Sequence, residues 1–151
     1  TLVPDPPGAL TSSFGWDCEK YKSLSIDVVK NFQQKNIRVS LFINPSIKSL
    51  INLKEILPNR VELYTFDFAK NFAFDQQNAI KPYLEVTQFL QENIPSISLN
   101  AGHDLNLKNL NYLLTNIPAI KEVSIGHALV CDAFEYGLID TIQKYLTITK
   151  R

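Results

Sequence analysis

The chain has 151 residues, of which 45% are hydrophobic and 11% aromatic, and this is enough apolar material for one compact core or a large part of one. Fifteen basic residues balance fifteen acidic ones, so no net field attracts a nucleic acid or an anionic membrane. No stretch approaches the roughly 20 apolar residues of a membrane span, and no signal-peptide pattern opens the chain, so we expect a cytoplasmic protein without nucleic-acid or membrane partners.

Two cysteines, Cys18 and Cys131, lie far apart and lack CxxC spacing. We expect both to be reduced core thiols, because too few neighbouring ligands exist for a zinc site. The chain also lacks methionine and opens at Thr1 directly into an apolar run. We therefore expect it to be a segment of a longer protein.

The first half of the chain alternates short apolar runs with helical patterns. A strand is predicted at residues 1–3, and a loop rich in Pro, Gly and Ser follows it over residues 4–17. A helix is predicted at 25–35, and then a nearly continuous apolar run predicts a buried strand at 38–43. Apolar residues at helical spacing predict one further helix from Ile47 to about Leu57.

The middle of the chain repeats this order. A strand is predicted at 61–64, and the aromatic sequence TFDFAKNFAFD at 65–75 is interpreted as a long loop. A helical pattern then extends to about Asn93, with Pro82 disturbing its first turns.

The last part holds two more such units. A strand is predicted at 96–101, followed by a helix that contains Leu107 to Leu114, and another strand at 122–126 precedes a final helix. Five β units, each followed by a helix, predict either an open doubly wound sheet or the second part of an eight-stranded barrel. Periodicity does not choose between them, but no GxGxxG follows any strand to support dinucleotide binding.

The last two predicted strands end alike, with Gly102-His103 and Gly126-His127. Glycine lets the backbone approach a ligand, and amides near helix N-termini can bind an oxyanion. Histidine can also move protons near neutral pH. A single such pair would indicate only a turn with an exposed histidine, whereas two pairs in equivalent positions favour a phosphate-binding site.

Five runs together carry a family resemblance over essentially the whole chain: LVP at 2–4, VSLFI at 39–43, VELYT at 61–65, NAGHDL at 100–105 and SIGHAL at 124–129. In this order and spacing they resemble the pyridoxine 5'-phosphate synthase family. The resemblance implies a TIM (β/α)8 barrel, a single domain of which residues 1–151 would supply about the last five βα units. The family's strand-one, strand-two and strand-three residues, including two general bases, would then precede Thr1.

The resemblance also implies a reaction. The family condenses 3-amino-2-oxopropyl phosphate with 1-deoxy-D-xylulose 5-phosphate to give pyridoxine 5'-phosphate, inorganic phosphate and water, without a cofactor or metal. Family members are homo-oligomers, and the assembly implied here is an octamer. His103 matches the family's proton-donating histidine.

The same resemblance assigns the other candidate residues. Asp104, Gly126 and His127 match positions that hold the aminoketone phosphate, and Thr11 matches a contact to the sugar phosphate, for which Ser12 and Ser13 are substitutes in this unusual loop. Glu62 matches a glutamate that stabilises charge during the reaction.

A carboxylate in an apolar strand is costly to bury unpaired, so Glu62 is expected either to face the barrel interior as a functional group or to face outward in a salt bridge with a lysine.

The chain departs from the family at three positions: Tyr64 and Phe66 stand where histidine and glycine are common, and Asn44 stands for an acidic residue. Two other functions stay open. One is another phosphosugar-handling barrel, an isomerase or aldolase, although no strand end offers a Schiff-base lysine. The other is an α/β module that binds a phosphorylated metabolite without turnover.

Overall fold

A computed structural model describes residues 1–150 as four parallel strands with helices between them. The strands are β1 (Ser40–Ile43), β2 (Arg60–Tyr64), β3 (Ser98–Gly102) and β4 (Ile120–Ser124), and they pair in the order β1-β2-β3-β4. Sequential parallel neighbours of this kind arise when each crossover returns on the same side of the sheet. The α/β class predicted from the alternation is therefore confirmed.

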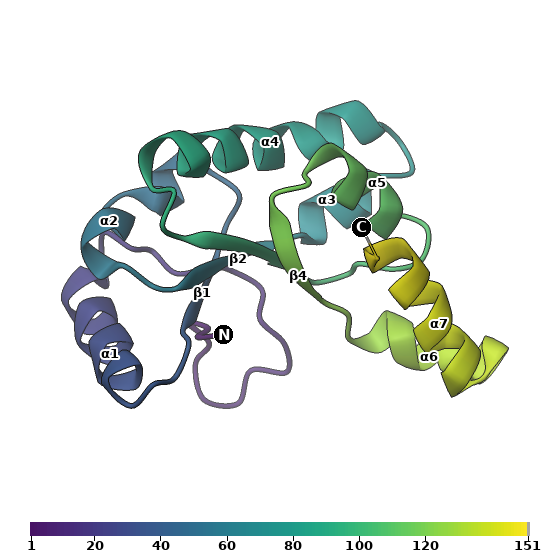
Figure 1. Cartoon of the computed structure of the whole chain (residues 1–151), viewed down its shortest axis with the longest axis horizontal. Helices are drawn as coiled ribbons and strands as arrows, with labels where there is room; N and C mark the ends of the chain where they lie inside the picture. The colour runs from purple at the N-terminus through teal and green to yellow at the C-terminus, as the bar shows by residue number, and fades with distance from the viewer. Residues whose placement is uncertain (151) are drawn as a thin grey trace.

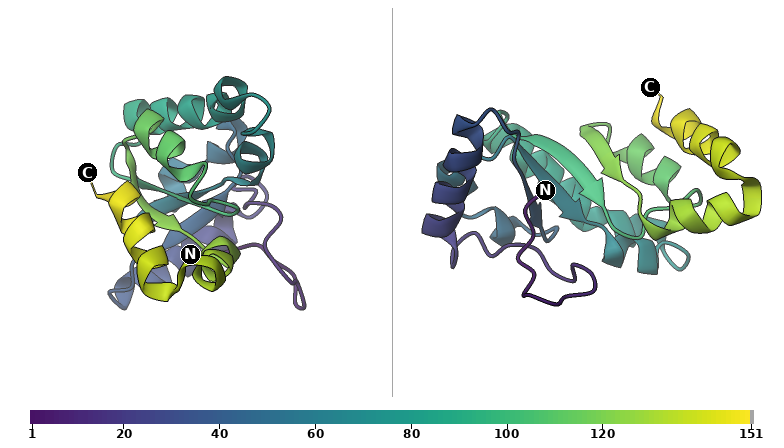
Figure 2. Two further views of the ribbon diagram at one scale, coloured as in Figure 1. Left: turned by 90° about the vertical axis from the view of Figure 1, so that its right-hand side faces the viewer. Right: turned by 90° about the horizontal axis from the view of Figure 1, so that it is seen from below.

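The helices fan around one side of the sheet, and the loop of residues 4–21 lies on the other (Figures 1 and 2). The helical elements, in chain order, are α1 (Lys22–Gln34), the short 3-10 helix η1 (Ile47–Leu50), α2 (Leu53–Ile56), α3 (Phe66–Asn71), α4 (Gln76–Asn93), α5 (Leu110–Asn116), α6 (His127–Tyr136) and α7 (Leu138–Thr149). None of these helices in residues 1–150 is both long and apolar enough to cross a bilayer.

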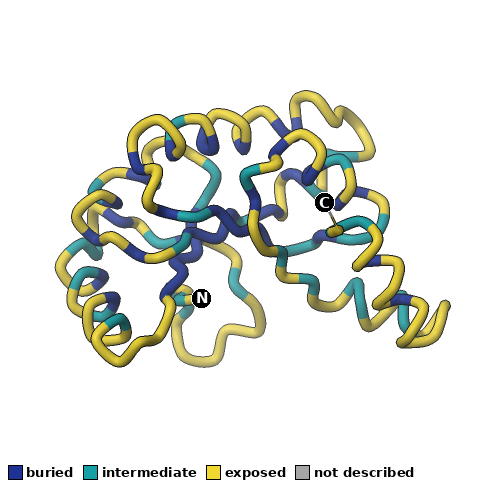
Figure 3. Tube along the Cα trace, viewed as in Figure 1, coloured by how far each residue is buried: buried dark blue, intermediate teal, exposed yellow. Residues whose placement is uncertain are grey.

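The core lies between the sheet and its helices. Val61 and Leu63 of β2 are fully buried, as are Val86 of α4 and Leu113 of α5, and the sheet forms the buried centre of the trace in Figure 3. Fully burying a side chain of this size contributes about 1.5–3 kcal/mol. Only β1 is buried at every position, as its continuous apolar run predicts.

The expected strand at residues 1–3 is reduced to a single bridge. Leu2 pairs in parallel with Leu41, with the Leu2 amide donating to Ser40 at 2.8 Å and the Phe42 amide donating to Leu2 at 3.0 Å. Pro4 follows directly and has no amide to extend the ladder. The fifth predicted β unit thus lies beside β1 but is not a strand.

Two single-helix predictions were wrong. The predicted helix at 47–57 is split into η1 and α2, because Asn52 adopts a left-handed conformation with φ of 63°. The final helix is divided at Gly137, whose φ of 81° no right-handed helix contains, into α6 and α7.

The aromatic segment at 65–75 was also interpreted wrongly as a loop, since α3 lies within it. Phe68 is fully buried there, and its ring packs edge-on against Tyr83 of α4 with 5.8 Å between centroids. Helix α4 ends at Asn93 as predicted and continues through Pro82, because its inner face, including Tyr83 and Val86, is buried against the sheet.

Of the two cysteines, Cys18 is a buried core thiol as predicted, whereas Cys131 is free but exposed on α6. The expectation of two core thiols is therefore wrong for Cys131. In the described part of the chain α6 buries no residue completely, which explains the exposure.

Candidate functional site

The two faces of the sheet differ in chemistry. Aligned rows place Leu41, Val61 and Leu99 on the face that the helices cover. The rows between them carry polar side chains across the strands toward the opposite face: Arg60, Glu62, Asn100, Glu122 and Ser124. A parallel sheet buried on both faces would be apolar throughout, so the polar face is the place to look for function.

An ion-pair network links charged and amide side chains on this polar face. Arg38 donates two hydrogen bonds to Glu122, at 2.9 and 3.0 Å, and Arg60 donates to Asn100 at 2.8 Å. Desolvation opposes ionisation of Glu122, but the hydrogen bonds from Arg38 and the charges of both arginines outweigh it and lower the pKa of that carboxyl. These contacts join the segment just before β1 to β4, and β2 to β3, and they leave the carboxyl edge of the sheet to other residues.

At the carboxyl edge, the N-terminal loop folds over the strand ends. The Gly15 amide donates to the Asn44 side chain at 3.0 Å, and the Trp16 amide donates to the Phe42 carbonyl at 2.8 Å. A Cβ on Gly15 would collide with the backbone of Ile43 and Asn44, so only glycine permits this approach. The loop is thereby held with Thr11 beside the strand ends.

A hollow of about 1160 Å³ lies at this edge. It brings together five of the six site residues predicted from the sequence: Thr11, His103, Asp104, Gly126 and His127. Ser12 and Ser13, which the sequence offered as substitutes for Thr11, also line it. The other lining residues were not assigned to the site from the sequence: Phe14, Asn44, Pro45, Tyr64, Phe66, Asp67 and Ser124. The Ser12 hydroxyl donates a hydrogen bond to Asp5, whereas the neighbouring Thr11 is exposed.

His103 lies among aromatic rings. Its imidazole is 5.0 Å from the Phe42 ring and 5.0 Å from the Tyr64 ring, measured between centroids. Burial, and then the charges of Asp104 and Asp67, raise the pKa of Tyr64, so its hydroxyl keeps its proton at neutral pH. The His103 imidazole thus lies in the wall of the hollow, in contact with an apolar ring and a neutral phenol.

The two Gly-His pairs are not equivalent in backbone conformation. His103 has a φ of 86° and is separated from α5, which begins at Leu110, by the six residues Asp104 to Asn109, whereas His127 is the first residue of α6. The expectation that both amides lie at helix N-termini therefore holds only for His127. His127 Nε2 nevertheless comes within 3.9 Å of Asp104 Oδ1, so the two loops meet across the hollow.

Glu62 is buried behind this hollow and does not line it. Its side chain is only 6% exposed, and one carboxylate oxygen accepts a hydrogen bond from the Thr1 hydroxyl at 2.7 Å. The other oxygen lies where a Cβ on Gly102 would be, so Gly102 is required to accommodate the carboxylate. Among residues 1–150 no lysine pairs with Glu62, which removes the outward-facing salt bridge as its explanation.

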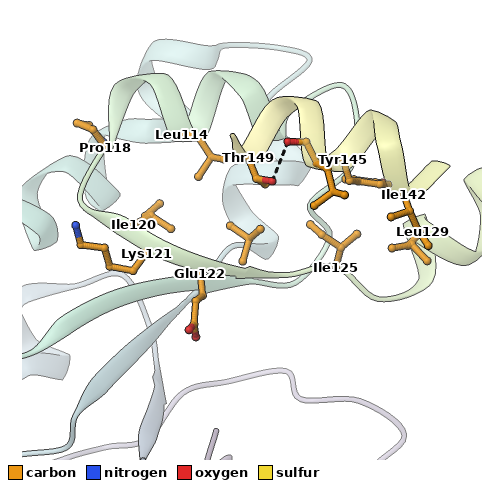
Figure 4. A pocket seen from close by; sticks show the side chains of 12 residues that line it. Leu114, Pro118, Ile120, Lys121, Glu122, Ile125, Leu129, Ile142, Tyr145 and Thr149 are labelled. Atoms are coloured by element: carbon orange, nitrogen blue, oxygen red, sulfur yellow. Dashed lines mark hydrogen bonds between the residues drawn. The ribbon is translucent and has the colours of Figure 1, made fainter. Parts of the chain in front are cut away.

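A second hollow, of about 690 Å³, lies on the helical side of β4, between that strand and α7 (Figure 4). Its wall is mainly aliphatic, with Ile120, Ile125 and Leu129 facing Ile142 and Tyr145, while Glu122 points away from it. Among residues 1–150 no histidine lines this second hollow, and the Glu122 carboxylate does not face it. The hollow at the strand ends is therefore the better candidate for chemistry.

Together, the fold and the site define an α/β protein whose hollow, lined by two histidines and two aspartates, lies beyond the carboxyl ends of parallel strands. Ligands of α/β proteins bind at this edge. Within residues 1–150 no three His, Cys, Asp or Glu side chains gather closely enough to hold a metal ion.

Comparison with known proteins identifies the family. The family model described as "Pyridoxal phosphate biosynthesis protein PdxJ" matches residues 1–151, and the chain belongs to this family. The chain is similar to the pyridoxine 5'-phosphate synthase of Cytophaga hutchinsonii, with 45% identity over 100% of the chain and 63% of the relative.

Two further relatives with the same name agree. The protein of Christiangramia forsetii is 44% identical over 99% of the chain and 62% of its own length, and that of Flavobacterium johnsoniae is 40% identical over 97% and 61%. The chain thus spans a little over three fifths of the length of the curated relatives that it matches.

Proposed function

We propose that this chain is the C-terminal part of a pyridoxine 5'-phosphate synthase, which condenses 3-amino-2-oxopropyl phosphate with 1-deoxy-D-xylulose 5-phosphate. The observation that carries the proposal is the meeting of His103, Asp104, Gly126 and His127 at one hollow, in a chain of this family. Relatives with this name, 40–45% identical, support the reaction. The products are pyridoxine 5'-phosphate, inorganic phosphate and water.

The full protein, in this proposal, is a TIM barrel. Four parallel strands in sequential order, with Leu2 beside β1, correspond to about five of eight βα units, and five eighths agrees with the 63% of the Cytophaga relative that the chain covers. Strand β4 pairs only with β3 among the described residues, which leaves its other edge available to a further strand. The polar face of the sheet would then face the barrel interior.

His103 is proposed as the proton donor and acceptor during ring formation. Ring closure expels water and phosphate, and a hydroxyl leaves as water only when a proton is delivered to its oxygen. The imidazole at the wall of the hollow, seated between Phe42 and Tyr64, can serve this purpose.

The substrate phosphates are proposed to bind on two sides of the hollow. Gly126 has no atom within 4 Å of where a Cβ would lie, so an anion can approach the backbone at the N-terminus of the ten-residue helix α6 beside His127. Asp104 lies across from them, where its carboxylate suits the amino group of the aminoketone phosphate better than its phosphate. Thr11, with Ser12 and Ser13 next to it, supplies hydroxyls for the sugar phosphate.

Glu62 is proposed to stabilise positive charge from behind the hollow. Its carboxylate is buried, and in the described part of the chain no cation neutralises it. A buried carboxylate acts over a longer range than an exposed one, because the medium between it and the reacting atoms is less polar than water.

Self-association is part of the proposal. Phe134 is 88% exposed and Ile139 is 76% exposed, and they lie on α6 and α7. Large apolar side chains exposed together mark interaction surfaces. Light scattering of the full-length protein at micromolar concentration should give a mass several times that of one polypeptide, whereas a monomer would exclude this part.

The function is tested by incubating the full-length protein with both substrates and quantifying pyridoxine 5'-phosphate and inorganic phosphate. The proposal predicts equal amounts of the two products and no product when either substrate is omitted. Phosphate release without the pyridine product would favour another phosphosugar enzyme. Binding of either substrate without any turnover would favour a non-catalytic module.

A further inference from the structure

The turn that carries His103 and Asp104 has an unusual backbone. Both residues have positive φ, 86° and 56°, although neither is glycine. Such conformations are uncommon for residues with a side chain and persist only where the surrounding structure holds them. The source of that support identifies residues that control where the His103 imidazole lies.

Thr65 supplies the first support. Its side chain is fully buried, and its hydroxyl lies within hydrogen-bonding distance of two carbonyl oxygens, that of Gly102 at 2.7 Å and that of His103. The Thr65 amide also donates to the Gly102 carbonyl at 2.9 Å. Within residues 1–150 no other donor reaches the His103 carbonyl, so this contact depends on the hydroxyl.

The Thr65 hydroxyl does not cap the helix that begins after it. Thr65 occupies the N-cap of α3, where threonine commonly accepts a hydrogen bond from the first turn of the helix. Here the side chain makes no cap hydrogen bond and is directed to the end of β3 instead. Helix α3 therefore lacks a hydrogen bond from its N-cap side chain, and the turn at His103 has a hydrogen bond from Thr65 instead.

Asn109 supports the other half of the turn. It is 2% exposed, and its side-chain nitrogen donates to the Asp104 carbonyl at 3.1 Å. Its side-chain oxygen accepts from the Asn106 amide at 2.9 Å, which fixes the orientation of the side chain. Consecutive carbonyls from Gly102 to Asp104 are therefore each held by a side chain, and Thr65 alone holds the one that belongs to His103.

We propose that Thr65 is a positioning residue whose hydroxyl fixes the His103 backbone and so directs the imidazole to the hollow. The catalytic consequence rests on the proposed function, whereas the geometric consequence does not. Without the hydroxyl, the His103 carbonyl loses its partner and the peptide plane is free to rotate. That rotation moves the Cα–Cβ bond and takes the imidazole away from the Phe42 and Tyr64 rings, 5.0 Å from each.

The chain offers a matched control in Thr87. It is also buried, at 6% exposure, and its hydroxyl donates to a backbone carbonyl, that of Tyr83, at 2.7 Å. This contact lies within α4 and does not line the hollow at the strand ends. Thr87→Val therefore removes the same kind of hydrogen bond from the same kind of environment, away from His103.

The test compares Thr65→Val, Thr65→Ser and Thr87→Val in the full-length protein, by crystal structure, thermal unfolding and steady-state kinetics. Thr65→Val should move or disorder the His103 imidazole and lower kcat by about tenfold to a hundredfold, since misplacement by about 1 Å costs that much. KM should hardly change, because the phosphate contacts stay. Thr65→Ser retains the hydroxyl and should restore both, and Thr87→Val should leave both unchanged.

The proposal is overturned if Thr65→Val leaves the imidazole in place and kcat equal to that of Thr87→Val. Should Thr65→Val fail to fold, Thr65→Ser and Thr65→Ala, which differ only in the hydroxyl, replace it with the same two outcomes. If the wild-type protein makes no pyridoxine 5'-phosphate, the proposed function fails, and the crystal structures alone still decide whether Thr65 positions His103.

Discussion

Gly102 offers the sharpest test of how Glu62 is placed. A Cβ at this position would collide with Oε1 of Glu62 and would lie 3.1 Å from the Ser124 Cβ. The φ of Gly102 is not in the positive range, so alanine is accepted by the backbone, and the effect of Gly102→Ala comes from the collision. Because the colliding atom is the end of a flexible side chain, the carboxylate should move and the strand should stay.

The magnitude follows from this geometry. Adding a methyl group to a filled space costs about 1–3 kcal/mol of unfolding free energy. In a Glu62→Ala background the space is empty, and only the contact with Ser124 opposes the methyl group. We therefore expect the two substitutions to be non-additive, with a coupling of about 1–2 kcal/mol, within the range known for residues in contact.

Urea unfolding of the wild-type full-length protein, Gly102→Ala, Glu62→Ala and the double variant measures this coupling. Gly126→Ala is the control, because a Cβ there meets nothing within 4 Å and stability should not fall. Turnover of Gly102→Ala should drop together with the displacement of Glu62. Additive free energies, or normal turnover despite destabilisation, would refute the placement of the carboxylate against Gly102.

Three further predictions concern charge and burial. Glu62→Gln keeps the shape but removes the charge, so kcat should fall on the order of a hundredfold, about 2.7 kcal/mol, with little change in melting temperature; near-normal turnover would remove Glu62 from the site. Cys18 is 1% exposed, and burial and then the Asp17 charge raise the pKa of its thiol to about 11. Iodoacetamide at pH 8 should therefore alkylate Cys18 only after the protein is unfolded in urea, and rapid labelling of Cys18 in the native protein would contradict this. Hydrogen bonds and charges from the arginines hold the pKa of Glu122 below its ordinary value, so its pair with Arg38 contributes stability at neutral pH and loses it as the pH falls through the folded-state pKa. Glu122→Gln should therefore be less stable than wild type at pH 7, and the gap should shrink as the pH is lowered; a gap that stays the same at every pH would be inconsistent with ionisation as the cause.

The order of the elements could be predicted because it depends on local patterns. The run at Leu41 to Ile43 is apolar at every position and is buried at every position. Helix α3 was missed for the opposite reason. Its helical state is supported by Phe68 packing on Tyr83, 15 residues away, and no local pattern contains that contact.

In the candidate site, too, the features that depend on local sequence could be predicted, and those that depend on contacts between strands could not. The glycines and histidines at the strand ends marked the edge where the hollow lies, and the five predicted residues there line it. The buried position of Glu62 and the role proposed for Thr65 depend on the register that sets Glu62 beside Asn100 and Tyr64 beside Gly102. A shift of one residue would turn each side chain to the other face, and the sequence of one strand does not fix its register with the next.

His103 is the residue on which the proposed reaction depends most directly, and comparing His103→Ala with the wild-type full-length protein tests it. Product formation from both substrates and binding of inorganic phosphate should be measured on the same preparations. His103→Ala should lower the rate of pyridoxine 5'-phosphate formation by about 10²- to 10⁴-fold while phosphate binds as before, because the imidazole moves protons and other groups hold the anion. Product formation at the wild-type rate by His103→Ala would contradict the role of the imidazole in proton transfer.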